Sequence, residues 1–441
     1  MKRYLLPLFL ACAAVLAAQT PDAKKFFGAG PVAADIKLPA DLVYPQGKLF
    51  PFSFYSTGGG SERKREELLP PDVRLKDQLE IIKAGVTMIG PQYELNDMSF
   101  EVAQKNNVKL IYTVRVAIDG VPMDRKYIWA LNAKNPLPEE KLRAAVAEKV
   151  KAVAGHKEIA WWDIGAEELR FWKKYEVDIL RIMAETIRAN DPLKRPVVMY
   201  EPGHRGAQSL AKLLPYQDLS FKGMYVTYYG MKKQRVWARW SIEQQVEATK
   251  IAGKPEVPVI ALPSMFKQPE PADLPLIPAW VKHDVYTALA AGAKGVVIFS
   301  ASKRPNFTAR QAYLDEYFKA CRQLTGPFGL GQVFLFGKRM DDLEIAVVDG
   351  PQTTTLVKDK IKKEYPSVNF ANIAYNHERY LVLVNDTPTP VKAIVSGLPY
   401  GTETVAKDLL DDASNEFSAP EGDLEAELGP WGAAVFRVRR K

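Results

Sequence analysis

Gly292-Ala293-Lys294-Gly295-Val296-Val297-Ile298-Phe299 joins two kinds of structure within one short stretch. The apolar pattern of residues 280–291 is typical of a helix, which Gly292 can end, because glycine readily adopts the left-handed conformation found after helix C-termini. The run from Val296 to Phe299 is apolar without alternation, as in strands buried on both faces of a parallel sheet. A second helical pattern follows at residues 308–324. The stretch therefore predicts a helix–strand–helix unit of an α/β fold.

The same order recurs through the first three quarters of the chain. Apolar residues at helical spacing also occur at 73–83, 138–153, 177–189 and 242–251. The predicted strands are residues 49–55, 86–90, 108–115, 159–164, 196–200, 223–228, 257–262 and 295–299. This alternation predicts an α/β fold, a (β/α)8 TIM barrel. No phosphate-binding glycine spacing follows the first strand, which weighs against an open nucleotide-binding sheet.

The pattern changes after Gly326-Pro327. Short apolar segments are separated there by Gly, Pro, Asn and Asp, which is typical of an all-β sandwich. These segments are residues 333–336, 343–348, 380–384, 391–395 and 433–438. We therefore expect a barrel domain at 46–327 and a small C-terminal all-β sandwich at 328–441, preceded by a leader or linker at 19–45.

Residues 1–18 have the features of a secretory signal peptide. Lys2 and Arg3 precede an apolar run at residues 5–16, and small residues follow it. The run is too short for a membrane span, which needs about 20 apolar residues. The expected location is therefore secreted or periplasmic. Lipoprotein anchoring at Cys12 is the alternative, but Phe9-Leu10-Ala11 matches the usual anchoring motif poorly.

Composition argues against several kinds of partner. The net charge is +8 over 441 residues, and no block of like charges indicates nucleic-acid binding. The four histidines form no HExxH motif or Cys/His cluster, so neither a metal site nor a cofactor is predicted. Cys321 lies in an apolar helical pattern and is expected to be a buried, unreactive thiol.

The fourth predicted strand leads into the most informative segment, Trp161-Trp162-Asp163-Ile164-Gly165-Ala166-Glu167-Glu168. In a (β/α)8 barrel the active site lies at the C-terminal ends of the strands. A glycosidase needs a carboxylic acid there to protonate the leaving oxygen, and adjacent Glu167 and Glu168 disfavour each other's ionisation. The alternative is that both glutamates stabilise the first turn of the next helix.

This segment resembles the fourth-strand motif of (β/α)8-barrel glycoside hydrolases, where an aromatic strand leads into Gly-Asp-Glu-Pro or a similar acidic turn. The resemblance implies that Glu167 is the catalytic acid/base, with Ala166 replacing the aspartate and Glu168 the proline. Residues 44–51 and 429–436 are also similar to segments of such enzymes. The resemblance implies a glycoside hydrolase with a β-sandwich appendage.

The seventh predicted strand departs from that family. In its largest retaining clan a second glutamate ends this strand, whereas here residues 259–265 contain no carboxylate. Glu201, after the fifth strand, is therefore the predicted second catalytic residue, with Glu94 or Asp97 as alternatives. An inverting enzyme would place it about 6.5–9.5 Å from the acid. A salt bridge from Glu201 to Arg205 or Arg170 is the structural alternative.

Aromatic and charged side chains at the same strand ends are predicted to bind substrate. Tyrosine and tryptophan faces can stack on sugar rings, although such residues are also common in strand cores. Asp163 could instead be a core aspartate that pairs with Arg115. The predicted substrate-binding residues are Tyr55, Tyr93, Glu94, Arg115, Trp162, Asp163, Glu168, Arg170, Tyr200, His204, Arg205 and Tyr228.

The sequence thus favours a glycoside hydrolase that acts on a poly- or oligosaccharide. Many Lys and Arg residues in the predicted loops favour an anionic glycan, uronate-bearing or sulfated, while ordinary surface solvation is the alternative. The missing carboxylate of the seventh strand motivates a second hypothesis, a non-catalytic glycan-binding protein on a degenerate TIM barrel. A surface scaffold whose sandwich mediates contacts is a third.

Overall fold

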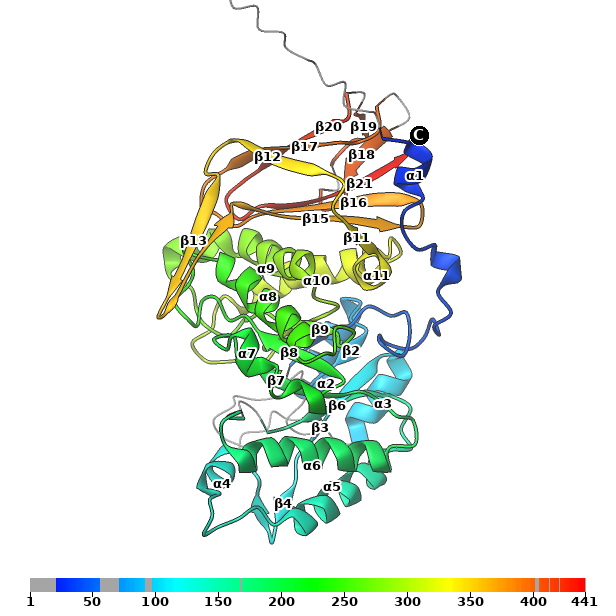
Figure 1. The fold of residues 1–441 in the computed structure, drawn as a ribbon. Coiled ribbons are helices and arrows are strands. Elements are labelled where there is room, and N and C mark those ends of the chain that lie inside the picture. Colours follow the sequence, from blue (N-terminus) through cyan, green and yellow to red (C-terminus); the bar gives the residue numbers. More distant parts are fainter. Residues whose placement is uncertain are drawn as a thin grey trace, which may run out of the picture.

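The computed structural model of the protein describes residues 21–55, 71–91, 97–166, 169–400, 404–411, 413–419 and 421–440 (Figure 1). The predicted signal peptide with Cys12 lies outside these residues. Four of the predicted site residues also lie outside them: Tyr93, Glu94, Glu167 and Glu168.

Eight parallel strands form the predicted barrel. In sheet order they run β1-β10-β9-β8-β7-β6-β3-β2. β1 and β2, the first and last strands of this order, are also joined by hydrogen bonds near their ends. The Thr87 N–H donates to the Phe52 carbonyl at 3.3 Å, and the Gly90 N–H donates to the Phe54 carbonyl at 3.2 Å. The strands are β1 (Phe52–Phe54), β2 (Met88–Ile89), β3 (Lys109–Val114), β6 (Ile159–Ile164), β7 (Val197–Glu201), β8 (Leu219–Gly223), β9 (Val259–Leu262) and β10 (Val296–Ile298).

Helices surround this barrel. Gly292 ends one of them as the sequence predicts, with a left-handed φ of +119°. Between β7 and β8 the chain forms only the short α7 (Ala207–Leu210) and the 3-10 turn η2 (Leu214–Tyr216). The longer helices are α2 (Pro71–Lys83), α3 (Asp97–Asn106), α5 (Glu139–Val153), α6 (Lys174–Asn190), α8 (Val236–Ile251), α9 (Ile277–Ala291), preceded by the 3-10 helix η3 (Pro271–Leu276), and α10 (Arg310–Thr325).

Side chains on each strand alternate between the barrel interior and the layer that faces the helices. On β7, Val198 and Tyr200 pack with the interior cluster that contains Phe221. Val197 and Met199, between them in sequence, pack with the helices instead. This alternation decides which predicted site residues reach the open end of the barrel.

Two predicted strands are wrong. The sixth strand was expected at 223–228, but β8 ends at Gly223. Its outward positions hold Ser220 and Lys222, and this polarity hides a strand whose side chains are all buried. Residues 333–336 were expected as a strand but belong to helix α11 (Leu330–Phe336). Four apolar residues without alternation suit either structure.

The C-terminal unit is the predicted β-sandwich. A six-stranded sheet, β11-β15-β16-β21-β18-β19, and a three-stranded sheet, β12-β17-β20, enclose an apolar cluster that includes Leu381 and Val395. The strands are β11 (Lys338–Met340), β12 (Glu344–Asp349), β15 (Val368–Tyr375), β16 (Glu378–Asn385), β17 (Val391–Ser396), β18 (Thr404–Asp408), β19 (Phe417–Ser418), β20 (Asp423–Leu428) and β21 (Ala433–Arg440), with a separate hairpin of β13 (Thr353–Lys358) and β14 (Ile361–Pro366).

The N-terminal segment packs against this sandwich, away from the barrel mouth. Phe26 and Phe27 of α1 (Ala23–Phe27) join the sandwich core, and Arg379 Nε donates to the Phe26 carbonyl at 3.0 Å. The short 3-10 helix η1 (Ala33–Asp35) follows. This segment was expected to be a leader or linker, and here part of it contributes to the core.

Helices α8 and α9 of the barrel lie beside the sandwich (Figure 1), and a buried polar cluster joins them to it. His283 Nε2 hydrogen-bonds Asp386 Oδ1 at 2.9 Å, and its Nδ1 hydrogen-bonds Asp284 Oδ1 at 3.1 Å. Arg239 reaches the other oxygen of Asp386 at 3.3 Å. Burial alone lowers the pKa of His283, but its two carboxylate partners outweigh burial and raise the pKa above its usual value.

Candidate functional site at the barrel mouth

Asp163 faces the barrel interior near the C-terminal end of β6. Its side chain accepts a hydrogen bond from Thr113 Oγ1 of β3 at 2.8 Å, and the residue is only 5% exposed. Arg115 follows the same end of β3. A Cβ at Gly165 would lie 3.0 Å from Arg115 Cγ, so the missing side chain lets Arg115 lie across the end of β6. The structure thus brings predicted residues Asp163 and Arg115 to adjoining strand ends.

Trp162 lies on the other face of the same strand. It is fully buried among the helices, and its Nε1 donates to Asp191 Oδ2 at 2.8 Å. The Arg195 guanidinium covers the ring at 4.8 Å. Trp162 was predicted to bind substrate, but it belongs to the packing between barrel and helices. We assign it no part in substrate binding.

Glu201 also points toward the helices, because it lies on the face of β7 opposite to Tyr200. It is fully buried, and it accepts hydrogen bonds from Arg205 Nη1 and Gln217 Nε2, each at 3.1 Å. Lys222 of the neighbouring strand donates to the Pro202 and Arg205 carbonyls at 2.7 and 3.0 Å. The salt bridge between Glu201 and Arg205, which the sequence offered as the structural alternative to a catalytic role, is therefore present.

Burial governs the ionisation of this cluster. Desolvation raises the pKa of Glu201, although the charges of Arg205 and Lys222 oppose the rise. Desolvation likewise lowers the pKa of Lys222, against the charge of Glu201. Perturbed pKa values often mark active sites, but buried structural ion pairs produce them as well. Here the outward direction of both side chains indicates a structural cluster.

Aromatic side chains gather at the ends of β7 to β10, and we call this group the aromatic shelf: Tyr200, Tyr225, Tyr228, Phe266 and Phe299. Tyr225 stacks on Tyr200 and Phe299, with ring centroids 5.9 and 5.5 Å apart. Phe266 lies 5.4 Å from Tyr225 and 5.6 Å from Tyr228. Tyr228 is 57% exposed, so the shelf presents an aromatic surface to solvent.

Polar groups border the aromatic shelf. The Arg304 guanidinium lies 5.4 Å from the centroid of Phe266 and donates to Ser300 Oγ at 3.1 Å. His204, which is exposed, hydrogen-bonds the Tyr229 hydroxyl through Nδ1 at 3.2 Å. Predicted residues Tyr200, Tyr228 and His204 thus lie together. Tyr55 lies deeper, buried 5.3 Å from Phe299.

The sequence prediction missed three members of the shelf and Arg304. Tyr225 was placed within the sixth strand, because the displaced prediction ran from 223 to 228. Phe266 and Arg304 lie a few residues beyond the ends of β9 and β10, and Arg304 was counted only among the many positively charged loop residues. Phe299 was read as strand core. These residues would have been identified if β8 had been ended at Gly223 and if more residues after each strand had been considered as site candidates.

Arg170 lies outside the barrel proper and is held by α6. Its backbone N–H and its Nε both donate to the buried Glu176 carboxylate at 2.6 Å. Its guanidinium lies 5.0 Å from the ring centroid of Trp129. Arg170 therefore pairs with Glu176 rather than with Glu201.

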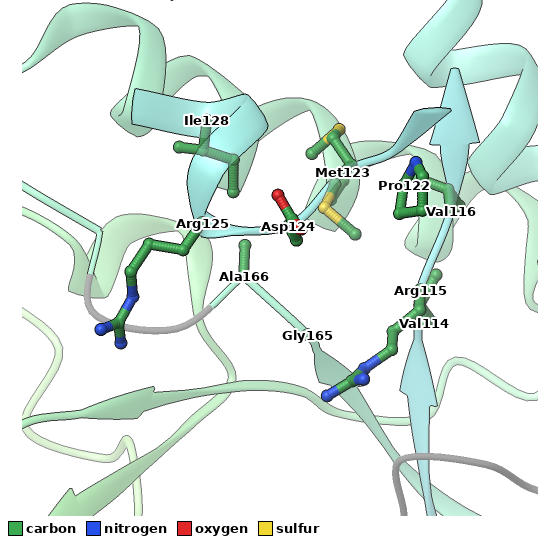
Figure 2. A pocket seen from close by; sticks show the side chains of 11 residues that line it. Val114, Arg115, Val116, Pro122, Met123, Asp124, Arg125, Ile128, Gly165 and Ala166 are labelled. Atoms are coloured by element: carbon green, nitrogen blue, oxygen red, sulfur yellow. The ribbon is translucent and has the colours of Figure 1, made fainter. Parts of the chain in front are cut away.

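A cavity of about 200 Å³ opens beside the end of β6 (Figure 2). Figure 2 shows Arg115 and Arg125 on either side of the Gly165–Ala166 backbone, with Met123 and Ile128 on another wall. Its lining residues are Val114, Arg115, Val116, Pro122, Met123, Asp124, Arg125, Ile128, Gly165, Ala166 and Met183.

Among the described residues, no group of three or more His, Cys, Asp or Glu is placed to hold a metal ion. None of the described helices is long and apolar enough to cross a membrane. Cys321 is buried in α10 as predicted, and burial raises the pKa of its thiol to about 12, so the thiol is unreactive near neutral pH.

No family model and no curated protein sequence matches this chain. Solved structures do. The α-amylase of Geobacillus thermoleovorans in complex with acarbose superposes with a TM-score of 0.55 at 12% identity, covering 89% of this chain and 98% of that chain. An Anoxybacillus α-amylase gives 0.53 at 12% identity, with coverages of 89% and 98%. The α-amylase of H. orenii gives 0.54 at 11% identity, with coverages of 88% and 99%.

These similarities extend over both units of the chain. The protein therefore has the fold of TIM-barrel glycoside hydrolases that carry a C-terminal β domain. At such low identity the likeness concerns the fold, and function has to be argued from the site itself.

Proposed function

We propose that the protein is a glycoside hydrolase that cleaves a poly- or oligosaccharide by carboxylate acid/base catalysis. One observation carries the proposal: an inward carboxylate, Asp163, stands at the C-terminal end of β6, and an aromatic shelf occupies the ends of β7 to β10. Active sites of this fold lie at that end of the barrel. The predicted signal peptide supports an extracellular site of action.

In this proposal Glu167, which follows β6 by three residues in the sequence, is the general acid. It protonates the glycosidic oxygen as the bond to the leaving sugar breaks. The sugar ring gains positive charge in that step, and the Asp163 carboxylate stabilises this charge from within the barrel mouth. A water molecule then bonds to the anomeric carbon and returns a proton to the Glu167 carboxylate, which restores the acid. The exposed ring of Tyr228 offers a stacking surface for a neighbouring sugar unit.

Asp163 replaces Glu201 as the second carboxylate of the proposed mechanism. Glu201 is fully buried on the helix-facing side of β7 and already pairs with Arg205. A water or sugar at the barrel mouth would meet Tyr200 instead, the inward neighbour of Glu201. Asp163 is oriented by the Thr113 hydroxyl, which donates to its Oδ2 at 2.8 Å.

The test compares Glu167→Gln with Glu158→Gln on a panel of poly- and oligosaccharides, with released reducing ends as the readout. Glu158 directly precedes β6, at the opposite end of the strand, and therefore controls for the loss of one glutamate. We expect Glu167→Gln to lower kcat by about 10²–10⁴-fold, the usual contribution of a general acid. Glu158→Gln should retain the wild-type rate. Equal rates for wild type and Glu167→Gln would remove Glu167 from the mechanism.

A non-catalytic glycan-binding protein is the second candidate. The residues after β9 favour it. The strand ends at Leu262 and is followed by Pro263, Ser264 and Met265, none of which is a carboxylate. The two candidates differ on the same panel. Saturable binding with no release of reducing ends from any glycan would favour the binding protein.

A further inference from the structure

Residues 115–138, between β3 and α5, form an excursion with its own secondary structure. β4 (Ala117–Ile118) and β5 (Val121–Pro122) make a hairpin, and the Met123 N–H donates to the Val116 carbonyl at 3.0 Å. Helix α4 (Arg125–Ala130) follows. Loops after barrel strands usually have about 2–6 residues, and much longer ones commonly serve a function. This excursion builds the outer wall of the cavity beside β6.

The inner wall of the cavity consists of the small residues that end β6. Gly165 and Ala166 add little side-chain bulk to this wall (Figure 2). Met183 of α6 also contributes to the lining. Pockets for small molecules commonly measure about 300–1,000 Å³, so a cavity of about 200 Å³ suits one charged substituent and part of a sugar ring.

The charged groups of the lining are two arginines and one aspartate. Asp124 caps α4, because its Oδ1 accepts the Tyr127 N–H at 3.0 Å. Arg115 and Arg125 lie on either side of the β6 end (Figure 2). A guanidinium presents a planar set of N–H donors that fits a carboxylate or sulfate, so two of them favour an anionic substituent.

An exposed tryptophan holds one of these arginines. Trp129 of α4 is 51% exposed, and the Arg125 guanidinium lies 5.5 Å from its ring centroid. Arg170 lies 5.0 Å from the same centroid and is fixed by the buried Glu176 carboxylate. Stacking of this kind fixes the orientation of a guanidinium. Trp129 is therefore a positioning residue for Arg125.

We propose that this cavity is a subsite for an acidic sugar, whose carboxylate or sulfate ester binds between Arg115 and Arg125. The proposal rests on the proposed function in one respect, that the ligand is a glycan. It makes the substrate class anionic and places its charged substituent beside β6, away from the aromatic shelf. The excursion at 115–138 then determines specificity rather than catalysis.

Isothermal titration calorimetry with matched ligand pairs tests the subsite. One pair is trigalacturonate and its fully methyl-esterified form. The other is a κ-carrageenan tetrasaccharide and its desulfated form. We expect the acidic member of one pair to bind at least about tenfold more tightly than its neutral counterpart, the effect of one charge-assisted pair. The pair that shows the preference distinguishes uronate from sulfate.

Three variants locate the effect. Arg125→Ala and Arg115→Met should each abolish most of the preference for the acidic ligand. Trp129→Ala should reduce it less, and the conservative Trp129→Phe should restore part of it. Lys126→Ala is the matched control, since it removes an exposed charge from the same helix outside the cavity lining. Equal affinities for both members of both pairs, or equal losses in Arg125→Ala and Lys126→Ala, would overturn the subsite.

Cleavage assays on the same ligands separate this proposal from the proposed function. Binding with an acidic preference but no cleavage of any glycan leaves the subsite standing and removes the hydrolase. Cleavage of neutral glycans at rates that Arg125→Ala does not change supports the hydrolase and removes the subsite.

Discussion

Asp163 and Glu201 stand at the ends of neighbouring strands in one barrel, but they face opposite sides of the sheet. Asp163 points into the barrel mouth and is held by the Thr113 hydroxyl. Glu201 points toward the helices, where Arg205, Gln217 and the Lys222 ammonium surround it. The sequence presents the two alike, each as an acid at the end of an apolar strand.

This difference shows that a shift of one residue along a strand decides the role of a carboxylate at the strand end. Side chains alternate with a period of two, so a residue one position further on reaches the opposite layer. In the helix-facing layer a carboxylate is dry and needs cations to offset its desolvation. At the barrel mouth it meets solvent, substrate and the groups of adjoining loops. Variants of the two acids should therefore fail in different ways.

Asp163→Asn is expected to have the largest effect on activity. It removes the negative charge that stabilises the developing positive charge on the sugar, while the amide keeps the volume and can still accept from Thr113 Oγ1. We expect kcat/KM to fall by about 10²–10³-fold, as for other preorganised electrostatic groups, with little change in the melting temperature. Steady-state kinetics with a cleaved glycan and a thermal melt measure both quantities.

Asp218→Asn is the matched control for this experiment. Asp218 precedes β8 at the opposite end of the barrel, where it pairs with Arg188 at 2.8 Å. Its loss should leave kcat/KM unchanged. A normal rate in Asp163→Asn would break the comparison, because both acids would then be structural.

Glu201→Ala is expected to have the next largest effect, on stability instead of catalysis. It leaves the Arg205 and Lys222 cations buried without a carboxylate, and removal of one member of a buried pair costs about 3–5 kcal/mol. Urea unfolding followed by tryptophan fluorescence measures this free energy. The fraction that remains folded should have the wild-type kcat.

Glu243→Ala is the matched control, because it removes a carboxylate from an ion pair that is partly exposed. Glu243 pairs with Arg239 at 2.8 Å while still partly exposed, so its removal should cost less than removal of Glu201. If Glu201→Ala kept its stability but lost kcat, the assignment of the two acids would have to be exchanged.

Most of the barrel could be predicted, because its strands are apolar runs and its helices have clear periodicity. The strand at 295–299 and the glycine cap before it illustrate this, since Gly292 ends α9 and β10 follows. The prediction of the sixth strand failed for a physical reason. Buried Ser220 and Lys222 gave the strand polar positions, and the hydrogen bonds that satisfy Lys222 come from tertiary structure, which a sequence pattern cannot show.

The site was harder to predict than the fold. The sequence shows that Asp163 and Glu201 lie at strand ends. It does not show which face of the sheet either side chain points to, because apolar runs without alternation do not reveal the strand's inward and outward positions. Trp161 and Trp162 show the same difficulty, as the first lies inside the barrel and the second outside it. The cavity at Arg125 depends on the fold of the 115–138 excursion, for which no single motif exists.

The smallest expected effect is a pH dependence of stability that arises from His283, another fully buried titratable residue. It lies in the dry layer between α9 and the sandwich, and its carboxylate partners Asp284 and Asp386 raise its pKa above the unfolded value. Arg235 forms an ion pair with Asp284, and Arg239 forms one with Asp386. A raised pKa means that the folded protein holds the proton more tightly than the unfolded chain. The resulting stability is fully present below about pH 6.5 and is lost as pH rises through the folded pKa.

His283→Gln should remove this pH dependence. In urea unfolding at intervals from pH 5.5 to 9, the difference in the free energy of unfolding between wild type and variant should fall by no more than about 1.4 kcal/mol per pH unit, the limit for one proton. Subtracting the variant's curve isolates His283 from Glu201 and Lys222, which contribute equally to both proteins. His377→Asn, an exposed change at a left-handed hairpin position that asparagine tolerates, should leave the curve unchanged. Parallel curves for wild type and His283→Gln would mean that His283 binds its proton equally tightly in the folded and unfolded states, so that its two carboxylate partners only offset the cost of burying the charge.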